Sequence, residues 1–239
     1  MAKQIIESEI SVIVYDDSKV SQIKAPMFDA VYWRGRATSS GQQGGRGSVL
    51  FVRHEERDWA IRHYYRGGMI GKLLTDQFFW TGQDDTRSFR EWHLLQALQR
   101  DGLPAPAPVA ARYQRSGLLY TADLITEKLP DVESLASRFL EQRVNTDNWH
   151  ATGACIAEFH ARGFCHADLN AWNIQLDQSG KTWVLDWDRG RRLQPGKWQQ
   201  ANLERLQRSV AKIGAQHNVQ LDAAGWEALL AGYAGQSDL

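Results

Sequence analysis

The stretch with the clearest chemical content is FHARGFCHADLNAWNIQLD, which is followed by VLDWDRG. Asp168 comes two residues after His166, Asn173 comes five residues after Asp168, and a second acid, Asp186, ends an apolar run further on. Phosphoryl transfer from ATP needs a carboxylate to accept the proton of an attacking hydroxyl. It also needs an amide oxygen and a second carboxylate to hold Mg²⁺ on the phosphates. The pattern predicts Asp168 as the catalytic residue and Asn173 and Asp186 as magnesium ligands.

The spacing H-x-D-x-x-x-x-N resembles the catalytic loop of eukaryotic-type kinases, and Asp186 stands at the position of the acid in their DFG motif. The neighbouring segments fit this order, because a helix is expected at 147–164 and a short hairpin at 173–188. His166 is expected to be a structural residue that hydrogen-bonds the backbone near the metal-binding acid. The alternative is that the loop residues form only a turn and that Asp186 only ends a strand.

The first half of the chain offers groups for the nucleotide. In DWAIRHYY, Arg62 takes the place of the strand lysine of kinases, and its guanidinium can bind phosphate; alternatively, it pairs with an acid on the sheet surface. Glu91 is placed to pair with that cation, although it could form a capping box with Ser88. The loop 37–47 lacks a GxGxxG motif, but its glycines can offer backbone N–H groups to phosphates. The loop residues assigned to ATP binding are Gly44, Gly45 and Gly47.

The order of the expected elements indicates an α+β fold. Strands are expected at 10–14, 30–34, 48–54, 58–65, 103–113 and 116–126, with one main helix at 86–100. Two amphipathic helices close the chain, and Asp222 is a candidate cap of the second. We therefore expect a two-lobed, protein-kinase-like fold. Its β-rich, ATP-binding N-lobe covers 1–127, and its small α-rich C-lobe, with the catalytic loop and metal site, covers 128–239.

Composition narrows the class of protein. The 239 residues carry no formal net charge, whereas a dedicated nucleic-acid binder usually shows a basic excess. Cys155 and Cys165 form no CxxC pair, so a zinc site is not expected and a reducing compartment fits. The sequence begins without the apolar core of a signal peptide, and no run reaches the roughly 18–20 apolar residues of a spanning helix. Any membrane contact is therefore expected to be peripheral.

The basic residues are unevenly distributed. Residues 31–72 hold eight Arg and Lys against three acids, and residues 186–212 hold seven against three. Both stretches could face an anionic ligand or surface. The alternative is that these charges are scattered over the solvated surface.

The segment after Asp186 bears on the acceptor. A protein kinase would carry a long activation segment there, which docks a peptide. Here RGRRLQPGKW runs almost directly into the final helices. We therefore expect no protein substrate, and a carbohydrate, a lipid-linked or a small-molecule acceptor instead.

One further stretch, RHYYRGGMIGKLLTDQFFWTG, together with CHADLNAWNI and VLDWDRGR, resembles the Kdo kinase branch of the lipopolysaccharide kinase family. The resemblance runs from about Trp33 to Trp226. It implies ATP-dependent phosphorylation of the 4-hydroxyl of 3-deoxy-D-manno-octulosonic acid (Kdo) on a lipid A precursor, with Mg²⁺ as cofactor. The enzyme would meet this lipid peripherally, at the cytoplasmic face of the inner membrane. Arg66 and Lys72 would neutralise the sugar carboxylate or lipid phosphates, or would simply be surface charges.

Other functions share part of the pattern. Aminoglycoside, choline and homoserine kinases carry a similar loop, but they usually have a larger helical C-lobe than this chain allows. A heptose kinase of the same broad family is another alternative. A pseudokinase scaffold usually lacks the loop acid or the metal-binding acid, and both are present here.

Overall fold

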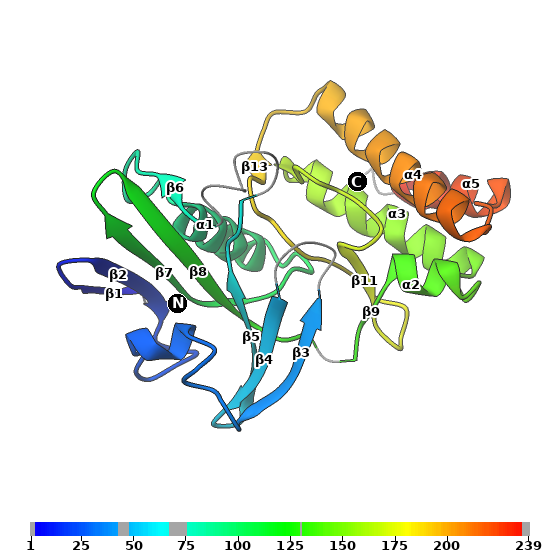
Figure 1. Cartoon of the computed structure of the whole chain (residues 1–239). Helices are drawn as coiled ribbons and strands as arrows, with labels where there is room; N and C mark the ends of the chain where they lie inside the picture. The colour runs from blue at the N-terminus through cyan, green and yellow to red at the C-terminus, as the bar shows by residue number, and fades with distance from the viewer. Residues whose placement is uncertain (1–2, 43–47, 67–75, 130, 236–239) are drawn as a thin grey trace. The chain divides into compact units, whose positions relative to one another are not determined.

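The computed structural model describes residues 3–42, 48–66, 76–129 and 131–235 (Figure 1). The chain divides into two compact units. The first comprises Met1–Gln96 and Pro106–Lys128, and the second comprises Ala97–Ala105 and Leu129–Leu239. Strands dominate the first unit and helices dominate the second.

The first unit is built on an antiparallel sheet with the strand order β1-β2-β7-β8-β5-β4-β3, and β6 pairs with β8 (Figure 1). The strands are β1 (Lys3–Glu7), β2 (Ser11–Asp16), β3 (Ala37–Gln42), β4 (Ser48–His54), β5 (Arg57–His63), β6 (Phe78–Phe79), β7 (Pro108–Ser116) and β8 (Leu119–Glu127). A 3₁₀ turn, η1 (Ala25–Phe28), and one helix, α1 (Arg87–Arg100), complete this unit's regular structure in the described ranges.

Alternation along β5 separates two kinds of residue. Trp59 and Ile61 are buried in a core cluster that includes Met27 and Phe28 of η1. The side chain of Arg62 points to the other face, where it meets α1. The hydrophobic residues thus fix which side of the strand presents the arginine.

The helix α1 begins one residue later than expected, and its apolar stripe is as predicted. Phe89, Trp92, Leu95 and Leu98 are all at most 1% exposed. Ser88 does not cap the helix, because its hydroxyl donates to the carbonyl of Arg112 on β7 (2.9 Å). The capping-box alternative for Glu91 is therefore wrong.

The second unit contains four helices within the described part of the chain: α2 (Leu135–Leu140), α3 (Thr146–Ala161), α4 (Lys197–His217) and α5 (Ala223–Gly235). Its strands are β9 (Glu133–Ser134), β10 (Phe164–Cys165), β11 (Ile174–Leu176), β12 (Thr182–Val184) and β13 (Arg191–Arg192). They form a three-stranded sheet, β12-β11-β9, and a two-stranded sheet, β10-β13. The expected hairpin of the second half is present as β11 and β12.

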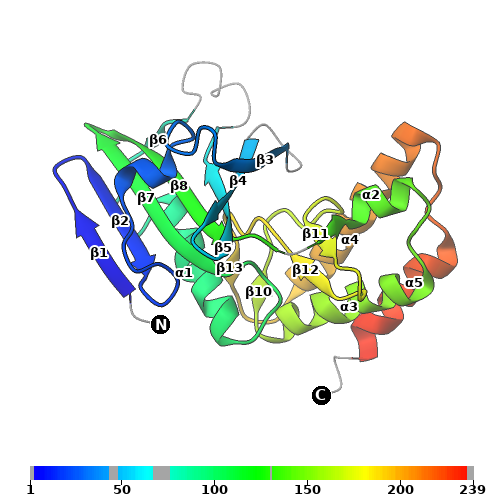
Figure 2. The ribbon, with the colours of Figure 1, turned by 90° about the horizontal axis from the view of Figure 1, so that it is seen from below.

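Close packing of α3 and α5 depends on glycine, and Figure 2 shows the two helices side by side. A Cβ added at Gly153 would lie 1.9 Å from the carbonyl oxygen of Leu229, and one at Gly232 would lie 2.1 Å from that of His150. Any larger residue would force the backbones apart. Gly163, at φ +79°, lies beyond the end of α3 in a conformation that favours glycine.

One expected strand, at 30–34, is absent, and the strand expected at 10–14 begins one residue later, as β2. Residues 30–34 form consecutive turns after η1, with the amide of Arg34 bonded to the carbonyl of Val31 (3.2 Å). Aromatic residues such as those at 32 and 33 are typical of strands. In the structure Trp33 is buried, and its indole N–H donates to the carbonyl of Met27 (2.8 Å). Ile10 lies outside β2 and is 63% exposed. Burial does not alternate along β2, because the strand is covered on both faces from Ser11 onward.

Candidate phosphoryl-transfer site

The predicted catalytic loop lies between β10 and β11 and is organised by His166, which is 2% exposed. Its Nδ1 accepts the backbone N–H of Asp168 (3.1 Å), and its Nε2 donates to the carbonyl of Leu185 (2.9 Å). The loop that bears Asp168 and the segment that bears Asp186 are therefore bonded to one imidazole. This is the structural role expected for His166.

The charge state of His166 follows from these bonds. A nitrogen that accepts an amide hydrogen carries no proton, so the ring is neutral. Burial lowers the pKa of His166 and outweighs the opposing effects of the Leu185 carbonyl and of the Asp186 and Asp168 carboxylates. A neutral imidazole holds these two acids in place without neutralising either of them.

The carboxylate of Asp168 is accessible, with 52% of the side chain exposed. Arg205 of α4 donates to Oδ1 of Asp168 from Nε (3.0 Å) and from Nη2 (2.6 Å). Both nitrogens donate to the same oxygen, so Oδ2 can accept a hydrogen bond from another donor, such as a substrate hydroxyl.

Asn173 is held by its own loop. Its Nδ2 donates to the carbonyl of Asp168 (3.0 Å), and this bond fixes which end of the amide is nitrogen. The side-chain oxygen therefore points away from that carbonyl. The backbone carbonyl of Asn173 accepts a hydrogen bond from the N–H of Leu185 (2.8 Å). The backbone of Asn173 is therefore bonded directly to the residue before Asp186.

Asp186 follows β12 in a left-handed conformation, with φ at +60°. Few residues other than glycine adopt this conformation, although Asp tolerates it, and such positions concentrate at functional sites. A carboxylate and an amide oxygen are the hard ligands that Mg²⁺ prefers. Within the described ranges no group of three or more His, Cys, Asp and Glu gathers as a metal site. The assignment of Asn173 and Asp186 to Mg²⁺ stays a prediction.

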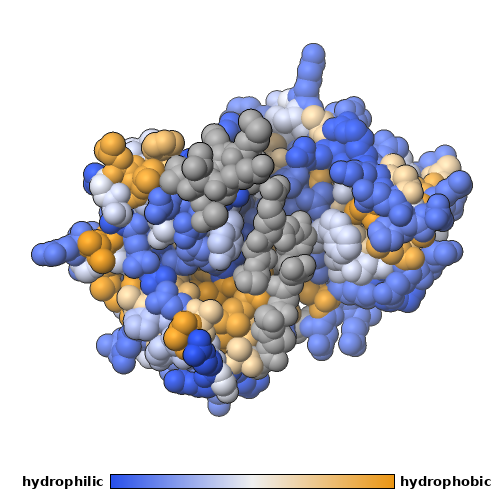
Figure 3. Space-filling model, viewed as in Figure 1, coloured by the Kyte–Doolittle hydropathy of each residue, from blue (hydrophilic) through white to orange (hydrophobic). Residues whose placement is uncertain are grey.

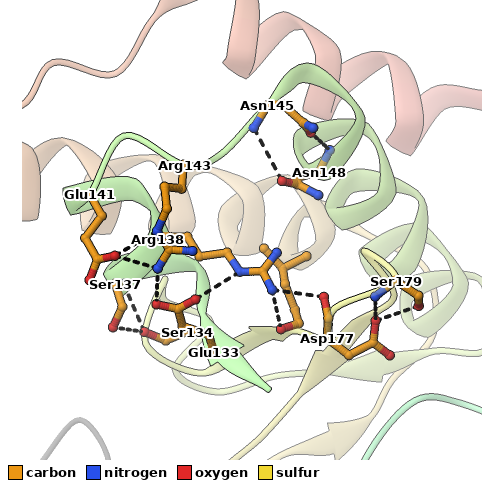
Figure 4. A network of polar contacts seen from close by, with 11 residues as sticks. Glu133, Ser134, Ser137, Arg138, Glu141, Arg143, Asn145, Asn148, Asp177 and Ser179 are labelled. Carbon is orange, nitrogen blue, oxygen red and sulfur yellow. Dashed lines mark hydrogen bonds and ion pairs between the residues drawn. The ribbon is translucent and has the colours of Figure 1, made fainter. Parts of the chain in front are cut away.

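A polar network anchors the far end of β11 (Figure 4). Arg138 of α2 donates to the carbonyls of Leu176 (3.1 Å) and Asp177 (2.9 Å) and to the carboxylate of Glu133 (3.3 Å). The hydrogen bond from Arg143 lowers the pKa of Glu133. The helix and the hairpin are thus fastened together, which fixes the strand that starts immediately after Asn173.

The first unit holds the predicted cation of the ATP site. Arg62 of β5 forms an ion pair with Glu91 of α1, which is 3% exposed. Tyr64 donates its phenol to the same Glu91 oxygen (2.6 Å) and lies under the Arg62 guanidinium (4.8 Å to the ring centre). Burial, and then the charge of Glu91, raise the pKa of Tyr64 well above its usual value. The phenol therefore stays protonated and remains a donor to Glu91.

The remaining predicted residues are less informative. Arg66 lies over the rings of Phe78 and Phe79 (5.5 and 5.4 Å), where it contacts apolar side chains. Four predicted residues lie outside the described residues: Gly44, Gly45, Gly47 and Lys72. Their assignments to ATP or to the acceptor stay predictions.

Sequence reasoning missed two residues around this loop, Arg205 and Asn202. The side-chain amide of Asn202 donates to the backbone carbonyl of His166 (3.1 Å). The helix α4 therefore contacts the loop at His166 as well as at Asp168. The only sequence signal for Arg205 was its place in the basic stretch 186–212. Nothing in the spacing links α4 to a loop 37 residues earlier.

Comparisons with known proteins now define the family. Residues 30–233 match the lipopolysaccharide kinase (Kdo/WaaP) family. A 3-deoxy-D-manno-octulosonic acid kinase of Stenotrophomonas maltophilia (strain R551-3) is 41% identical over 212 residues, 88% of this chain and 84% of that protein. One from Haemophilus influenzae (strain PittEE) is 36% identical over 230 residues, 92% of this chain and 95% of that protein.

A solved structure of WaaP in complex with acyl carrier protein shares the fold, with a TM-score of 0.58, 16% identity and coverage of 93% of this chain and 88% of that one. The predicted α+β kinase-like fold is confirmed, as are the predicted phosphotransferase class and the Kdo kinase branch. The chain belongs to the lipopolysaccharide kinase (Kdo/WaaP) family.

Proposed function

We propose that this Kdo kinase transfers the γ-phosphoryl group of ATP to the 4-hydroxyl of Kdo on a lipid A precursor, with Mg²⁺ as cofactor. Kdo phosphorylation in lipopolysaccharide core synthesis follows from the family and from the curated relatives. The observation that carries the chemistry is the buried neutral His166, which is bonded both to the Asp168 loop and to the segment before Asp186.

Asp168 is the catalytic residue in this proposal. Its exposed carboxylate orients the acceptor hydroxyl and accepts its proton as the oxygen attacks phosphorus. Asn173 and Asp186 would hold Mg²⁺, which supplies charge neutralisation on the phosphates. The bonds from His166 and from β11 keep these side chains in place before substrate binds.

In the first unit, Arg62 is the cation proposed to bind ATP phosphate. The buried Glu91 and the Tyr64 phenol hold its guanidinium on the α1 face of β5. A planar guanidinium offers several donors to phosphate oxygens, so an arginine can perform the task of the usual strand lysine. The glycines of the loop 37–47 would add backbone N–H groups.

The lipid acceptor implies work at the cytoplasmic face of the inner membrane. None of the helices in the described part of the chain is long and apolar enough to cross a membrane. Many basic residues of the two charged stretches already form ion pairs. These are Arg53, Arg57, Arg62, Arg189, Arg192, Arg205 and Arg208. Net positive charge alone is therefore weaker support for membrane contact than the sequence suggested.

Apolar side chains of the first unit give better support. Leu118 is 78% exposed at the turn between β7 and β8, and Phe79 of the adjacent β6 is 62% exposed. Figure 3 shows hydrophobic surface at this end of the sheet. The guanidinium groups of Arg66 and Arg115 lie over neighbouring aromatic rings there, which suits anionic head groups around an apolar tip.

Vesicle binding tests this surface. Leu118→Asp should weaken co-sedimentation with vesicles that carry anionic lipid, and added salt should weaken binding of the wild type because exposed charges are screened. Val31→Asp is the matched control, since Val31 is 69% exposed in the same unit but far from this turn in sequence. Equal binding by both variants and the wild type would exclude this membrane surface.

A transfer assay tests the activity. Labelled ATP should phosphorylate the Kdo-bearing lipid A precursor much faster than an aminoglycoside, choline, homoserine or a heptose acceptor, and product analysis should place the phosphate on the 4-hydroxyl. Asp186→Ala should abolish turnover, and Asn173→Ala should raise the Mg²⁺ concentration needed for half-maximal rate. Faster transfer to one of the small acceptors would overturn the proposed substrate, and an unchanged Mg²⁺ requirement in both variants would overturn the proposed ligands.

A further inference from the structure

The contact between Arg205 and Asp168 has no place in the reaction as described so far. Arg205 projects from α4, and two of its nitrogens donate to a single oxygen of the catalytic carboxylate. The two side chains are 46% and 52% exposed. Ion pairs this exposed contribute little to folding stability. Stability is therefore a poor explanation for an arginine in this position.

The geometry leaves donors for a second anion. A guanidinium has five N–H groups in a planar fork, and the contacts with Asp168 occupy only the Nε edge. Among the residues that the structure describes, Arg205 has no other hydrogen-bond or ion-pair partner. The end of the guanidinium formed by Nη1 and the second Nη2 hydrogen can therefore receive a carboxylate while Nε and Nη2 still hold Asp168.

We propose that Arg205 binds the carboxylate of the acceptor sugar and so selects an acidic sugar at the catalytic loop. The inference rests on the proposed function, in which the acceptor hydroxyl meets Asp168. A hydroxyl at that carboxylate brings the sugar's own carboxylate, only a few bonds away, within reach of the cation that already touches Asp168. Oδ2 of Asp168 then accepts the hydroxyl proton, while Arg205 holds Oδ1.

This assignment differs from the sequence expectation for the acceptor. Arg66 and Lys72 were expected to neutralise the sugar carboxylate or lipid phosphates, or to be surface charges. The guanidinium of Arg66 lies against Phe78 and Phe79 in the first unit. Arg205 contacts the catalytic residue itself. It is therefore the better candidate for an acceptor-binding residue.

The test compares two acceptors in matched variants. Steady-state kinetics are measured with the Kdo-bearing acceptor and with its methyl ester, which keeps the hydroxyl and removes the negative charge. The wild type should prefer the carboxylate by about tenfold to a hundredfold in kcat/KM, the range expected for a charge-assisted hydrogen bond. Where turnover of the ester is too slow to measure, its inhibition constant against the natural acceptor replaces KM.

Arg205→Gln should lose most of this preference through a higher KM for the carboxylate acceptor, with the KM for ATP little changed. Any loss of Asp168 positioning should lower kcat by the same factor for both acceptors and so leave the preference itself unaffected. Arg205→Lys should keep part of it, since a point charge remains. Arg208→Gln is the control, because Arg208 lies one turn further along α4 and pairs only weakly with Glu204 (3.8 Å). It should match the wild type with both acceptors.

A purely positioning role for Arg205 predicts a different result. If Arg205 only orients Asp168, Arg205→Gln lowers kcat by the same factor for both acceptors, and the preference for the carboxylate persists. That outcome would overturn the inference while leaving Kdo kinase activity intact. Failure of the wild type to phosphorylate the Kdo acceptor would instead reject the proposed function, and the inference with it.

Discussion

The two units handle charge in opposite ways. In the first, buried acids are paired with cations: Glu91 with Arg62, and Asp123, which is 1% exposed, with both Arg112 and His63. In the second, burial lowers the pKa values of His160 and His166, and both rings are neutral. The first unit pairs acids with cations in its interior. The second unit supports its catalytic loop with an uncharged, buried imidazole, and its Asp168 carboxylate pairs with Arg205 at the exposed surface.

This contrast fits the chemistry proposed for each unit. A cation that must bind phosphate has to be held in one position. A buried carboxylate such as that of Glu91 can hold it, because the carboxylate is itself fixed by the surrounding residues. Carboxylates that must bind Mg²⁺ or accept a proton have to keep their negative charge, and a neutral imidazole positions the backbone segments that carry them without adding a buried charge. Substitutions in one unit at a time test this contrast, and their expected effects range from a large loss of activity to a small shift in pH dependence.

The largest effect is expected in the second unit, from Asp168→Asn. The amide keeps the size of the side chain but cannot accept the hydroxyl proton, so kcat should fall by about 10²–10⁴-fold while the affinity for ATP persists. Transfer assays and nucleotide titrations measure the two quantities. Asp222→Asn is the control, because Asn also caps a helix and the α5 cap lies away from the loop. Retention of more than about a tenth of kcat by Asp168→Asn would remove Asp168 from the role of base.

The next effect breaks the charge pairing of the first unit. Arg62→Ala removes the cation paired with the buried Glu91, which should cost on the order of 3 kcal/mol of unfolding free energy and most of the activity. Arg62→Lys should keep part of both, because a cation remains. Arg57→Ala is the control on the same strand, since Arg57 is 46% exposed and its pair with Glu127 is of the kind that contributes under about 1 kcal/mol.

Thermal or chemical denaturation and ATP kinetics separate the two roles of Arg62. If Arg62→Ala loses stability but keeps a wild-type KM for ATP and wild-type kcat, Arg62 has only a structural role. If both fall, the paired guanidinium serves folding and the nucleotide together.

The sequence predicts local structure well where one short segment contains it. The spacing of Asp168, Asn173 and Asp186 requires only a loop and a hairpin, and the structure bonds these segments through His166. The α1 stripe was equally clear, because its apolar positions recur at helical spacing and all are buried. These features depend on neighbours in sequence.

Features that depend on distant partners were not predictable. Residues 30–34 have the composition of a strand, but Trp33 packs in the core with Met27 and Phe28 of η1. These residues therefore form turns and not a strand. Arg205 meets Asp168 only because α4 folds back over the loop. The row of His63, Asp123 and Arg112 arises from the register of β5, β8 and β7, which no single segment encodes.

A smaller effect concerns a neutral histidine of the second unit. His160 is 2% exposed, and burial lowers its pKa from 6.5 to about 4, despite the hydrogen bond that its Nε2 donates to Asn202. Between pH 6.5 and pH 4 the unfolded chain therefore binds a proton at His160 that the folded chain does not bind. The contribution of His160 to stability is complete above pH 6.5 and is lost as the pH falls toward 4. The loss attributable to this group is on the order of 3 kcal/mol across that window.

Denaturation midpoints of the wild type and of His160→Gln between pH 7 and pH 4 measure this loss. Gln can replace the bonds to Tyr233 and Asn202 but does not titrate, so the variant should be less sensitive to acid. His217→Gln, on the exposed end of α4, corrects for the loss of one histidine. Identical acid sensitivity in the wild type and His160→Gln would show that His160 is not the group responsible.

The smallest effect is of opposite sign and belongs to the first unit. Both ring nitrogens of His63 face carboxylates, Nδ1 at 2.6 Å from Asp123 and Nε2 at 3.2 Å from Asp76, so the ring is a charged double donor. Burial acts to lower its pKa, but the hydrogen bonds and charges of the two acids outweigh it and raise the pKa above 6.5. The folded chain therefore holds a proton that the unfolded chain has lost. The stabilisation is full below pH 6.5 and disappears as pH rises through the raised pKa.

Asp76→Asn probes this charge gently, because it removes the more exposed acid and leaves the buried Asp123 bonded to Arg112 (2.9 Å). The pKa of His63 should fall part of the way back, so the alkaline loss of stability should begin at lower pH in Asp76→Asn than in the wild type, and it should be absent in His63→Gln. Denaturation midpoints from pH 6 to pH 9 test the order. If all three proteins respond identically above pH 6.5, His63 is neutral in the fold and the two units treat their histidines alike. If the expected order is observed, acid weakens the unit that carries the catalytic loop and alkali weakens the unit that carries Arg62.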